Sequence, residues 1–311
     1  MLGKLFRSRR RGTSLDQVGV VIDAEGVLAL ALRRSDGQRP QLLSVFAGNV
    51  AELAGWVAAH SLQGAPTALV LEHGSYGIHQ LERPEVPAEE LRAALRWKLK
   101  DLLEYSPAEA VIDFFETPPA RQKRIEPVQV VAARRTLLKT RLAELGAAGL
   151  ELVRIDIPEF ALRNLVSRAL AASETTAVLY LQAQRGMLAI CRDDRFYMAR
   201  ALDHGLRSLG QGGSSGEDGG LSTWSDIDDR IALEVQRTMD YYDSHFGHAP
   251  VKRLLLPGTH PGLDRLAGYA ATALGIAAER AGAAQLCSAA DALDSDDERL
   301  PLAIGGALGI D

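Results

Sequence analysis

The sequence predicts an α/β protein built from two related lobes, and three observations lead to this prediction. The chain opens with three short apolar segments, at 17–23, 27–33 and 41–46, which are typical of antiparallel strands. Alternating helix and strand patterns follow them. A second triplet of strands then begins near 177, and aligning Asp23 with Gln182 gives an offset of 159 residues. Because 311 residues suffice for about two domains, the repeat indicates a duplicated architecture.

The first lobe is expected to span 14–172. Turn residues 24–26 and the pair Asp36-Gly37 separate its three opening strands. Asn49 is a suitable N-cap for the helix that follows. A buried strand is expected at 67–72.

A subdomain inserted into this lobe is expected at about 84–149. Pro87 favours the start of a helix, and leucines at helical spacing mark its apolar face: Leu91, Leu95, Leu99 and Leu102. Two strands and a helix follow, at 110–116, 128–132 and 136–148. The leucines expected to face inward on that helix are Leu138, Leu142 and Leu145. Gly149 is expected to end the helix, and a strand at 152–157 and a helix starting at Pro158 complete the lobe.

The second lobe is expected to span 173–300 and to repeat the strand triplet, at 177–181, 187–191 and 195–200. The Gly/Ser-rich stretch 209–225 predicts a flexible loop. A long helix then carries apolar residues at spacings of three or four: Ile231, Val235, Met239, Tyr242 and Phe246. A strand at 251–256 and a helix at 262–274 follow. The acidic segment 288–299 is expected to be mobile, and 301–311 to form a helix that returns to the first lobe.

Composition excludes several classes of function. A net charge of −5 and 5% aromatic residues argue against a nucleic-acid partner, which needs a basic face. The two cysteines, Cys191 and Cys287, lie far apart, so reduced thiols in a cytosol are expected. No apolar run approaches the roughly 20 residues that span a bilayer. The basic segment 1–13 predicts a flexible tail, which is either solvated or in peripheral contact with an anionic membrane surface.

Two strand triplets, each followed by alternating helices and strands, indicate the duplicated, RNase H-like fold of actin, sugar kinases and Hsp70. In that fold, two hairpin loops and an adenosine loop in the cleft between the lobes hold ATP. Backbone N–H groups cradle the phosphates, and a carboxylate in each hairpin orients Mg²⁺ or its water. The residues of this chain that remain to contact a nucleotide are Asp23, Gly26, Arg185, Gly186, Gly258 and Thr259.

All three loops depart from this pattern. Ala24 occupies an expected glycine position in the first hairpin, and Glu25 adds negative charge near a phosphate. Gln182 replaces the second carboxylate. Pro257 removes an N–H from the adenosine loop. These changes argue against tight binding of ATP and Mg²⁺, so no cofactor is expected, with ATP and Mg²⁺ kept as the alternative.

Five stretches resemble the PilM-like family of type IV pilus assembly proteins. VAARR at 131–135, followed after a helix by GLELVRIDIPEFAL at 149–162, is similar to a block of that family. LRWKLKDLL at 95–103 and AVIDFF at 110–115 resemble its MSHA branch, MshI. EVQRTMDYY at 234–242 is similar to the long helix of the family's second lobe.

The resemblance implies a cytoplasmic actin-like adaptor, peripheral at the inner membrane, in MSHA-type pilus biogenesis. It implies that a groove between the core of the first lobe and the insert binds the cytoplasmic tail of a PilN-like bitopic inner-membrane protein. Trp97 and Tyr105 are the insert aromatics that such a groove would use, although Trp97 also suits a core position. No catalytic or metal-binding residue is assigned, since no P-loop, GxSxG or HExxH motif occurs. An ATP-binding switch or weak ATPase of the same machinery is the alternative function.

Overall fold

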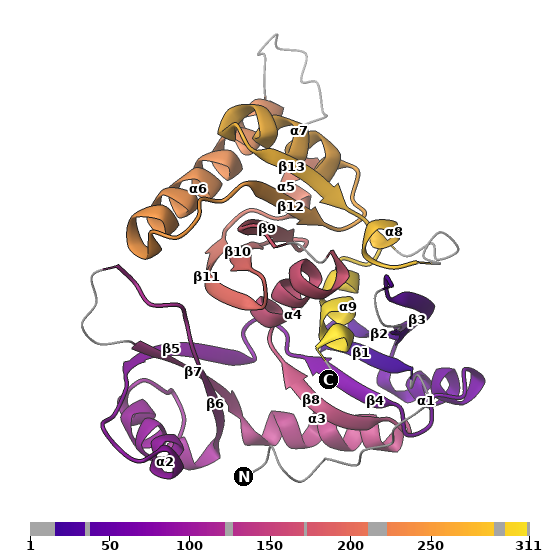
Figure 1. The fold of residues 1–311 in the computed structure, drawn as a ribbon. Helices are drawn as coiled ribbons and strands as arrows, with labels where there is room; N and C mark the ends of the chain where they lie inside the picture. Colours follow the sequence, from indigo (N-terminus) through magenta and orange to yellow (C-terminus); the bar gives the residue numbers. More distant parts are fainter. Residues whose placement is uncertain are drawn as a thin grey trace.

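The computed structural model describes residues 16–34, 38–121, 127–170, 173–210, 223–288 and 296–309. The basic segment 1–13, the Asp36-Gly37 turn and most of the loop 209–225 lie outside these residues. Figure 1 shows two lobes, with strands β9 to β13 in the upper one, and the insert beside the lower one.

The first lobe is built on a five-stranded sheet in the order β3-β2-β1-β4-β8. Its strands are β1 (Gln17–Asp23), β2 (Gly26–Arg33), β3 (Gln41–Gly48), β4 (Pro66–Val70) and β8 (Glu151–Asp156). The first three pair antiparallel, and β4 and β8 continue the sheet in parallel. Strands β1 and β2 are buried on both faces, which explains why they read as nearly continuous apolar runs.

The second lobe repeats this topology in a sheet of the order β11-β10-β9-β12-β13. Its strands are β9 (Thr176–Leu181), β10 (Gly186–Arg192), β11 (Arg195–Leu202), β12 (Arg253–Pro257) and β13 (Ala277–Ala281). Each strand has a counterpart at the same position in the first sheet, with β9 in the place of β1. The repeated order confirms the predicted duplicated α/β fold.

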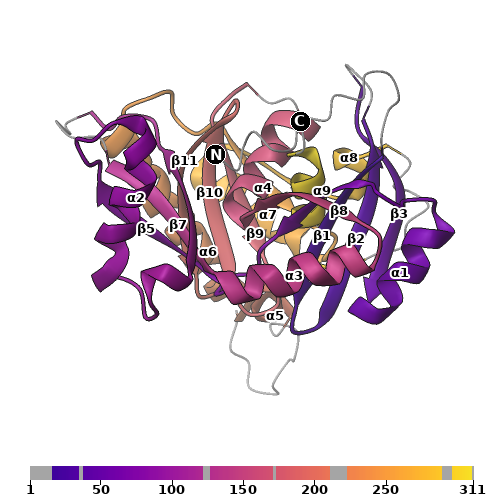
Figure 2. The same cartoon turned by 90° about the horizontal axis from the view of Figure 1, so that it is seen from below.

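The insert contains a three-stranded antiparallel sheet in the order β5-β7-β6. Its strands are β5 (Tyr76–Glu82), β6 (Ala110–Glu116) and β7 (Pro127–Arg134), and helix α2 (Ala88–Lys98) packs on one face through an apolar cluster. The segment predicted as the insert, about 84–149, begins after β5 and includes α3 (Arg135–Ala147). Helix α3 contacts both β7 and β8, and Figure 2 shows it running along the molecule from the insert to the first lobe.

The remaining helices cover the sheets or join the lobes. They are α1 (Val50–Ala59), α4 (Pro158–Asn164), which continues as a π-helical turn (Leu165–Ala169), α5 (Leu206–Gly210), α6 (Thr223–Phe246), α7 (Gly262–Leu274), α8 (Ala283–Leu286) and α9 (Leu300–Leu308), with 3-10 turns at Leu99–Asp101 and Pro107–Glu109. Helix α1 begins as predicted, because Asn49 and Glu52 form a reciprocal capping box.

Helix α9 is buried along its whole length against β1, β2, β4 and α4. Small residues permit this close approach: a Cβ on Gly19 would lie 1.8 Å from the Ala303 carbonyl oxygen, and one on Gly305 would lie 2.1 Å from that of Ala161. Helices α4 and α9 belong to one apolar cluster that also contains residues of both large sheets. The lobes therefore share a core, and α9 is fixed directly beside the crevice between them.

Two leucines predicted to be buried are exposed. Leu102 follows the end of α2, where a 3-10 turn changes the helical period and directs the side chain outward. Leu142 lies on the outer side of α3, whose buried face consists of Leu138 and Leu145. A spacing pattern shows neither where a helix changes its period, as before Leu102, nor how wide its buried face is, as at Leu142.

Candidate functional site

The two hairpin turns predicted to hold phosphates meet at the crevice between the lobes. Asp23, from the β1–β2 turn, lines a cavity of about 20 Å³ together with Arg185 and Gly186 of the β9–β10 turn. Gly26 has a φ of 126°, which glycine adopts readily, and this closes the first turn. The duplicated topology therefore brings these four predicted residues to one place.

The predicted adenosine loop lines a second, larger cavity. Gly258 and Thr259 follow β12 and line a space of about 360 Å³, whose wall also contains Ala183 and Glu298. Five of the six predicted nucleotide contacts therefore line the two cavities, and Gly26 lies opposite Asp23 in the first turn. The segment before α9 contributes to the wall of the larger cavity.

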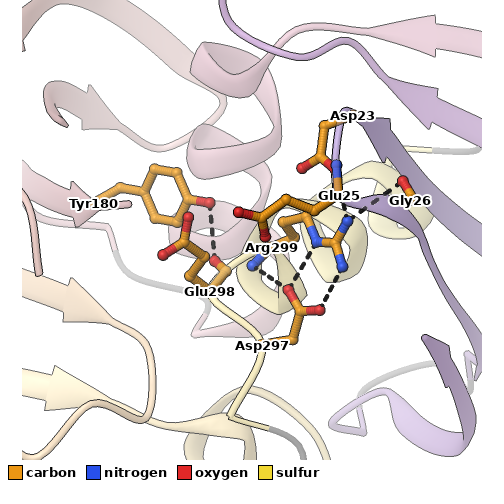
Figure 3. A network of polar contacts seen from close by, with 7 residues as sticks. All are labelled: Asp23, Glu25, Gly26, Tyr180, Asp297, Glu298 and Arg299. Atoms are coloured by element: carbon orange, nitrogen blue, oxygen red, sulfur yellow. Dashed lines mark hydrogen bonds and ion pairs between the residues drawn. The ribbon is translucent and has the colours of Figure 1, made fainter. Parts of the chain in front are cut away.

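The Arg299 side chain extends from the start of α9 into the crevice (Figure 3). Its Nη1 donates to Asp23 Oδ1 at 2.9 Å and lies 3.4 Å from the Gly26 carbonyl oxygen. Its Nε and Nη2 donate to the two carboxylate oxygens of Asp297, at 2.9 and 2.7 Å. The side chain is only 8% exposed. Its hydrogen bonds with Asp297 and the charges around it raise the Arg299 pKa.

Glu298 connects the same segment to the second lobe. Its carbonyl oxygen accepts a hydrogen bond from the Tyr180 hydroxyl at 2.9 Å. Burial raises the pKa of Glu298, although the nearby backbone of Ala183 opposes that shift. Burial also disfavours the charged form of Asp297, but hydrogen bonds from Arg299 overcome this effect and lower the Asp297 pKa.

Two further residues of the crevice, Glu72 and His73, follow the carboxyl end of β4 and line the smaller cavity. Burial and the Asp23 charge raise the pKa of Glu72, whereas burial and Arg185 lower the pKa of His73. Sequence reasoning did not single out these residues. Their position after a central strand of an α/β sheet is the signal that could have identified them.

The residues in the crevice do not fit a magnesium-bound triphosphate. A cavity of about 20 Å³ holds about one water molecule. The Asp23 carboxylate binds Arg299, and Gln182 supplies no charge to a metal. The larger cavity has the size of a small ligand pocket, but its wall offers a triphosphate one guanidinium, Arg207, against the two carboxylates of Asp296 and Glu298.

The segment 288–299 was predicted to be mobile, and this is wrong for Asp297–Arg299. Asp297 also accepts a hydrogen bond from the Arg299 backbone N–H at 2.9 Å, and Arg299 immediately precedes α9. Acidic composition suggested a solvated segment, but these charges have partners within the fold. Among the described residues, no three His, Cys, Asp or Glu side chains gather in a way that could hold a metal ion.

The two aromatic residues predicted to bind a partner lie on the insert. Trp97 of α2 is 76% exposed, so the alternative of a core position is wrong. Tyr105 is half-buried, with the Arg134 guanidinium 4.1 Å from its ring centroid. Neither residue lines the two cavities of the crevice.

The edge of the first sheet provides a second apolar surface. Val153 and Ile155 of the outermost strand, β8, are each more than one-third exposed, and Leu142 is exposed on the adjoining helix α3. The insert lies on this side of the sheet (Figure 1). It is joined to the core by a hydrogen bond of 2.7 Å from the Tyr76 hydroxyl to the buried carboxylate of Glu159.

No protein-family model matches the chain, and no curated protein matches its sequence. Among solved structures, a chain of a PilM-PilN type IV pilus biogenesis complex is 20% identical, with a TM-score of 0.65 over 95% of this chain and 98% of that one. The cytoplasmic domain of EpsL, an inner-membrane component of the type II secretion system of Vibrio cholerae, is 13% identical, with a TM-score of 0.52 over 95% and 96%. These likenesses show the fold, which is the two-lobed actin-like fold. Within the described residues, no helix combines the length and the apolar character needed to cross a bilayer.

Proposed function

We propose that this chain is a PilM-like adaptor of type IV pilus biogenesis, of the MSHA branch, that acts in the cytoplasm at the inner membrane. It binds the cytoplasmic tail of a PilN-like bitopic membrane protein and needs no nucleotide turnover to do so. One observation carries the proposal: the chain matches a component of a PilM-PilN complex over nearly the full length of both, while its own Arg299 binds the aspartate of the first hairpin.

The first lobe provides the proposed site for the tail, between its core and the insert. As an edge strand, β8 leaves one row of backbone groups without a strand partner in its sheet. An extended tail that paired with β8 would satisfy these groups and cover Val153 and Ile155. The hydrogen bond between Tyr76 and Glu159 holds the insert against the core, so the two sides of this site keep a fixed spacing.

Trp97 supplies the proposed contact on the insert. An indole that is 76% exposed offers a large apolar area with few rotatable bonds, which is the usual character of an interface hot spot. Tyr105 is the second aromatic contact in this proposal, and Arg134 holds its ring in place from one side.

Calorimetric titration with synthetic tail peptides of bitopic proteins encoded with the MSHA pilus tests the proposal. We expect one tail to bind the wild-type chain, and Trp97→Ala and Ile155→Asp each to weaken binding at least about tenfold. Tyr241→Ala is the matched control, because Tyr241 is an exposed aromatic on α6 of the second lobe. If none of the tails binds, the proposal is contradicted. If binding is equally strong in all variants, the tail occupies another surface.

A further inference from the structure

We infer that Asp297–Arg299 takes the place of a nucleotide and its cation in the crevice and fastens the two lobes together without a ligand. Figure 3 shows this segment between Asp23 and Gly26 of the first lobe and Tyr180 of the second. The inference concerns the relation between the lobes, so it does not depend on the proposed partner.

Arg299 takes the part of the cation. In actin-like proteins the aspartate of the first hairpin orients Mg²⁺ or its water, and here Asp23 instead accepts a hydrogen bond from the Arg299 guanidinium at 2.9 Å. The same nitrogen is 3.4 Å from the Gly26 carbonyl oxygen, so Arg299 contacts both ends of the turn. A buried guanidinium supplies a permanent positive charge, since it stays protonated at any working pH.

Glu298 takes the part of the anion. The second hairpin of this fold offers backbone N–H groups to phosphate oxygens. In this chain Glu298 lines the same cavity as Ala183 of that hairpin. The Tyr180 hydroxyl, from the adjoining strand β9, donates to the Glu298 carbonyl oxygen at 2.9 Å. The second lobe therefore holds Glu298 through its main chain, beside the second hairpin.

Asp297 and α9 make the connection rigid. Asp297 binds Arg299 through two charge-assisted hydrogen bonds, which fix the plane of the guanidinium. Helix α9 begins at the next residue and is buried against the first sheet. Moving the lobes apart at the crevice would separate Glu298 from Tyr180 or Arg299 from Asp23. The chain is therefore a permanently closed scaffold, unlike a switch that closes on a ligand.

Spin labels on the two lobes test this inference in the full chain. The native cysteines are buried, so labels attach selectively to exposed cysteines introduced as Ala58→Cys on α1 and Ala273→Cys on α7. We expect one narrow distribution of interlobe distances, unchanged by millimolar Mg-ATP. Tyr180→Phe and Arg299→Gln should each broaden it and lower the Tm by about 5 °C.

Arg33→Gln is the matched control, because it removes an ion pair with Asp16 outside the crevice and should leave the distribution unchanged. The inference is overturned if both crevice variants keep the narrow distribution of interlobe distances. It is also overturned if Mg-ATP shifts that distribution in the labelled chain whose crevice is unchanged. Should Arg299→Gln fail to fold, Tyr180→Phe provides the same readout, since it removes only the hydroxyl that donates to the Glu298 carbonyl oxygen.

Discussion

Replacing Arg299 by glutamine removes the cation on which the crevice network depends, and its cost follows from the geometry. The Arg299 side chain is 8% exposed, and the substitution leaves the carboxylates of Asp23 and Asp297 close together without a counter-ion. Removing one partner of a buried ion pair costs about 3–5 kcal/mol. Both carboxylates retain some solvent contact, so we expect the free energy of unfolding to fall by about 2–4 kcal/mol.

Urea unfolding followed by circular dichroism measures this loss. Arg33→Gln breaks an ion pair of similar length on the surface and should cost no more than about 1 kcal/mol. Asp23→Asn combined with Arg299→Gln should be less destabilising than the sum of the single substitutions, because both remove one shared interaction. If Arg299→Gln costs no more than Arg33→Gln, the network does not hold the crevice and the reasoning is refuted.

Three further outcomes are expected. Gly19→Ala places a methyl group 1.8 Å from the Ala303 carbonyl oxygen and should lower the free energy of unfolding by about 3 kcal/mol, so a loss below about 1 kcal/mol in urea would contradict direct packing of α9 on β1. Gly55→Ala, whose added Cβ has no atom within 4 Å, should instead stabilise α1 by about 0.5–1 kcal/mol in the same assay. Burial and Arg185 lower the pKa of His73 in the folded state, so the free energy of unfolding should fall as the pH drops below about 6.5. In thermal melts between pH 7 and 5, His73→Asn should make this decline shallower. Equal declines in the wild-type chain and the variant would count against the burial of the imidazole.

The strand triplets were predictable because the residues that determine each strand lie within the strand and the turns beside it. Strands β1 and β2 are apolar on both faces, and Asn49 marks the start of α1 by its capping chemistry alone. Strands β5 and β13 were missed for the opposite reason. Each is exposed on one face and carries charged or polar residues, as in His79 and Gln80 of β5, so neither forms an apolar run. Pairing with a neighbouring strand makes them strands, and a single sequence does not display that pairing.

The candidate site was predictable only in part. Duplication places Asp23 and Arg185 at equivalent turns, so their meeting at the crevice follows from the topology. The role of Asp297–Arg299 does not follow from sequence, since Arg299 binds Asp23 across 276 residues of chain. A run of charges next to a Gly/Ala-rich helix suggests a solvated linker. The outcome differs because α9 is drawn into the shared core and carries Arg299 with it.

Thermal melting in Mg-ATP tests most directly whether the crevice is closed to nucleotide. A ligand that binds only the folded state stabilises it by about 2.7 kcal/mol at a concentration 100 times its Kd, which raises the Tm by several degrees. We expect the Tm of this chain in millimolar Mg-ATP to stay within about 1 °C of its value in Mg²⁺ alone. A rise of several degrees that depends on ATP concentration would show that the segment before α9 yields to a nucleotide, and would contradict the account.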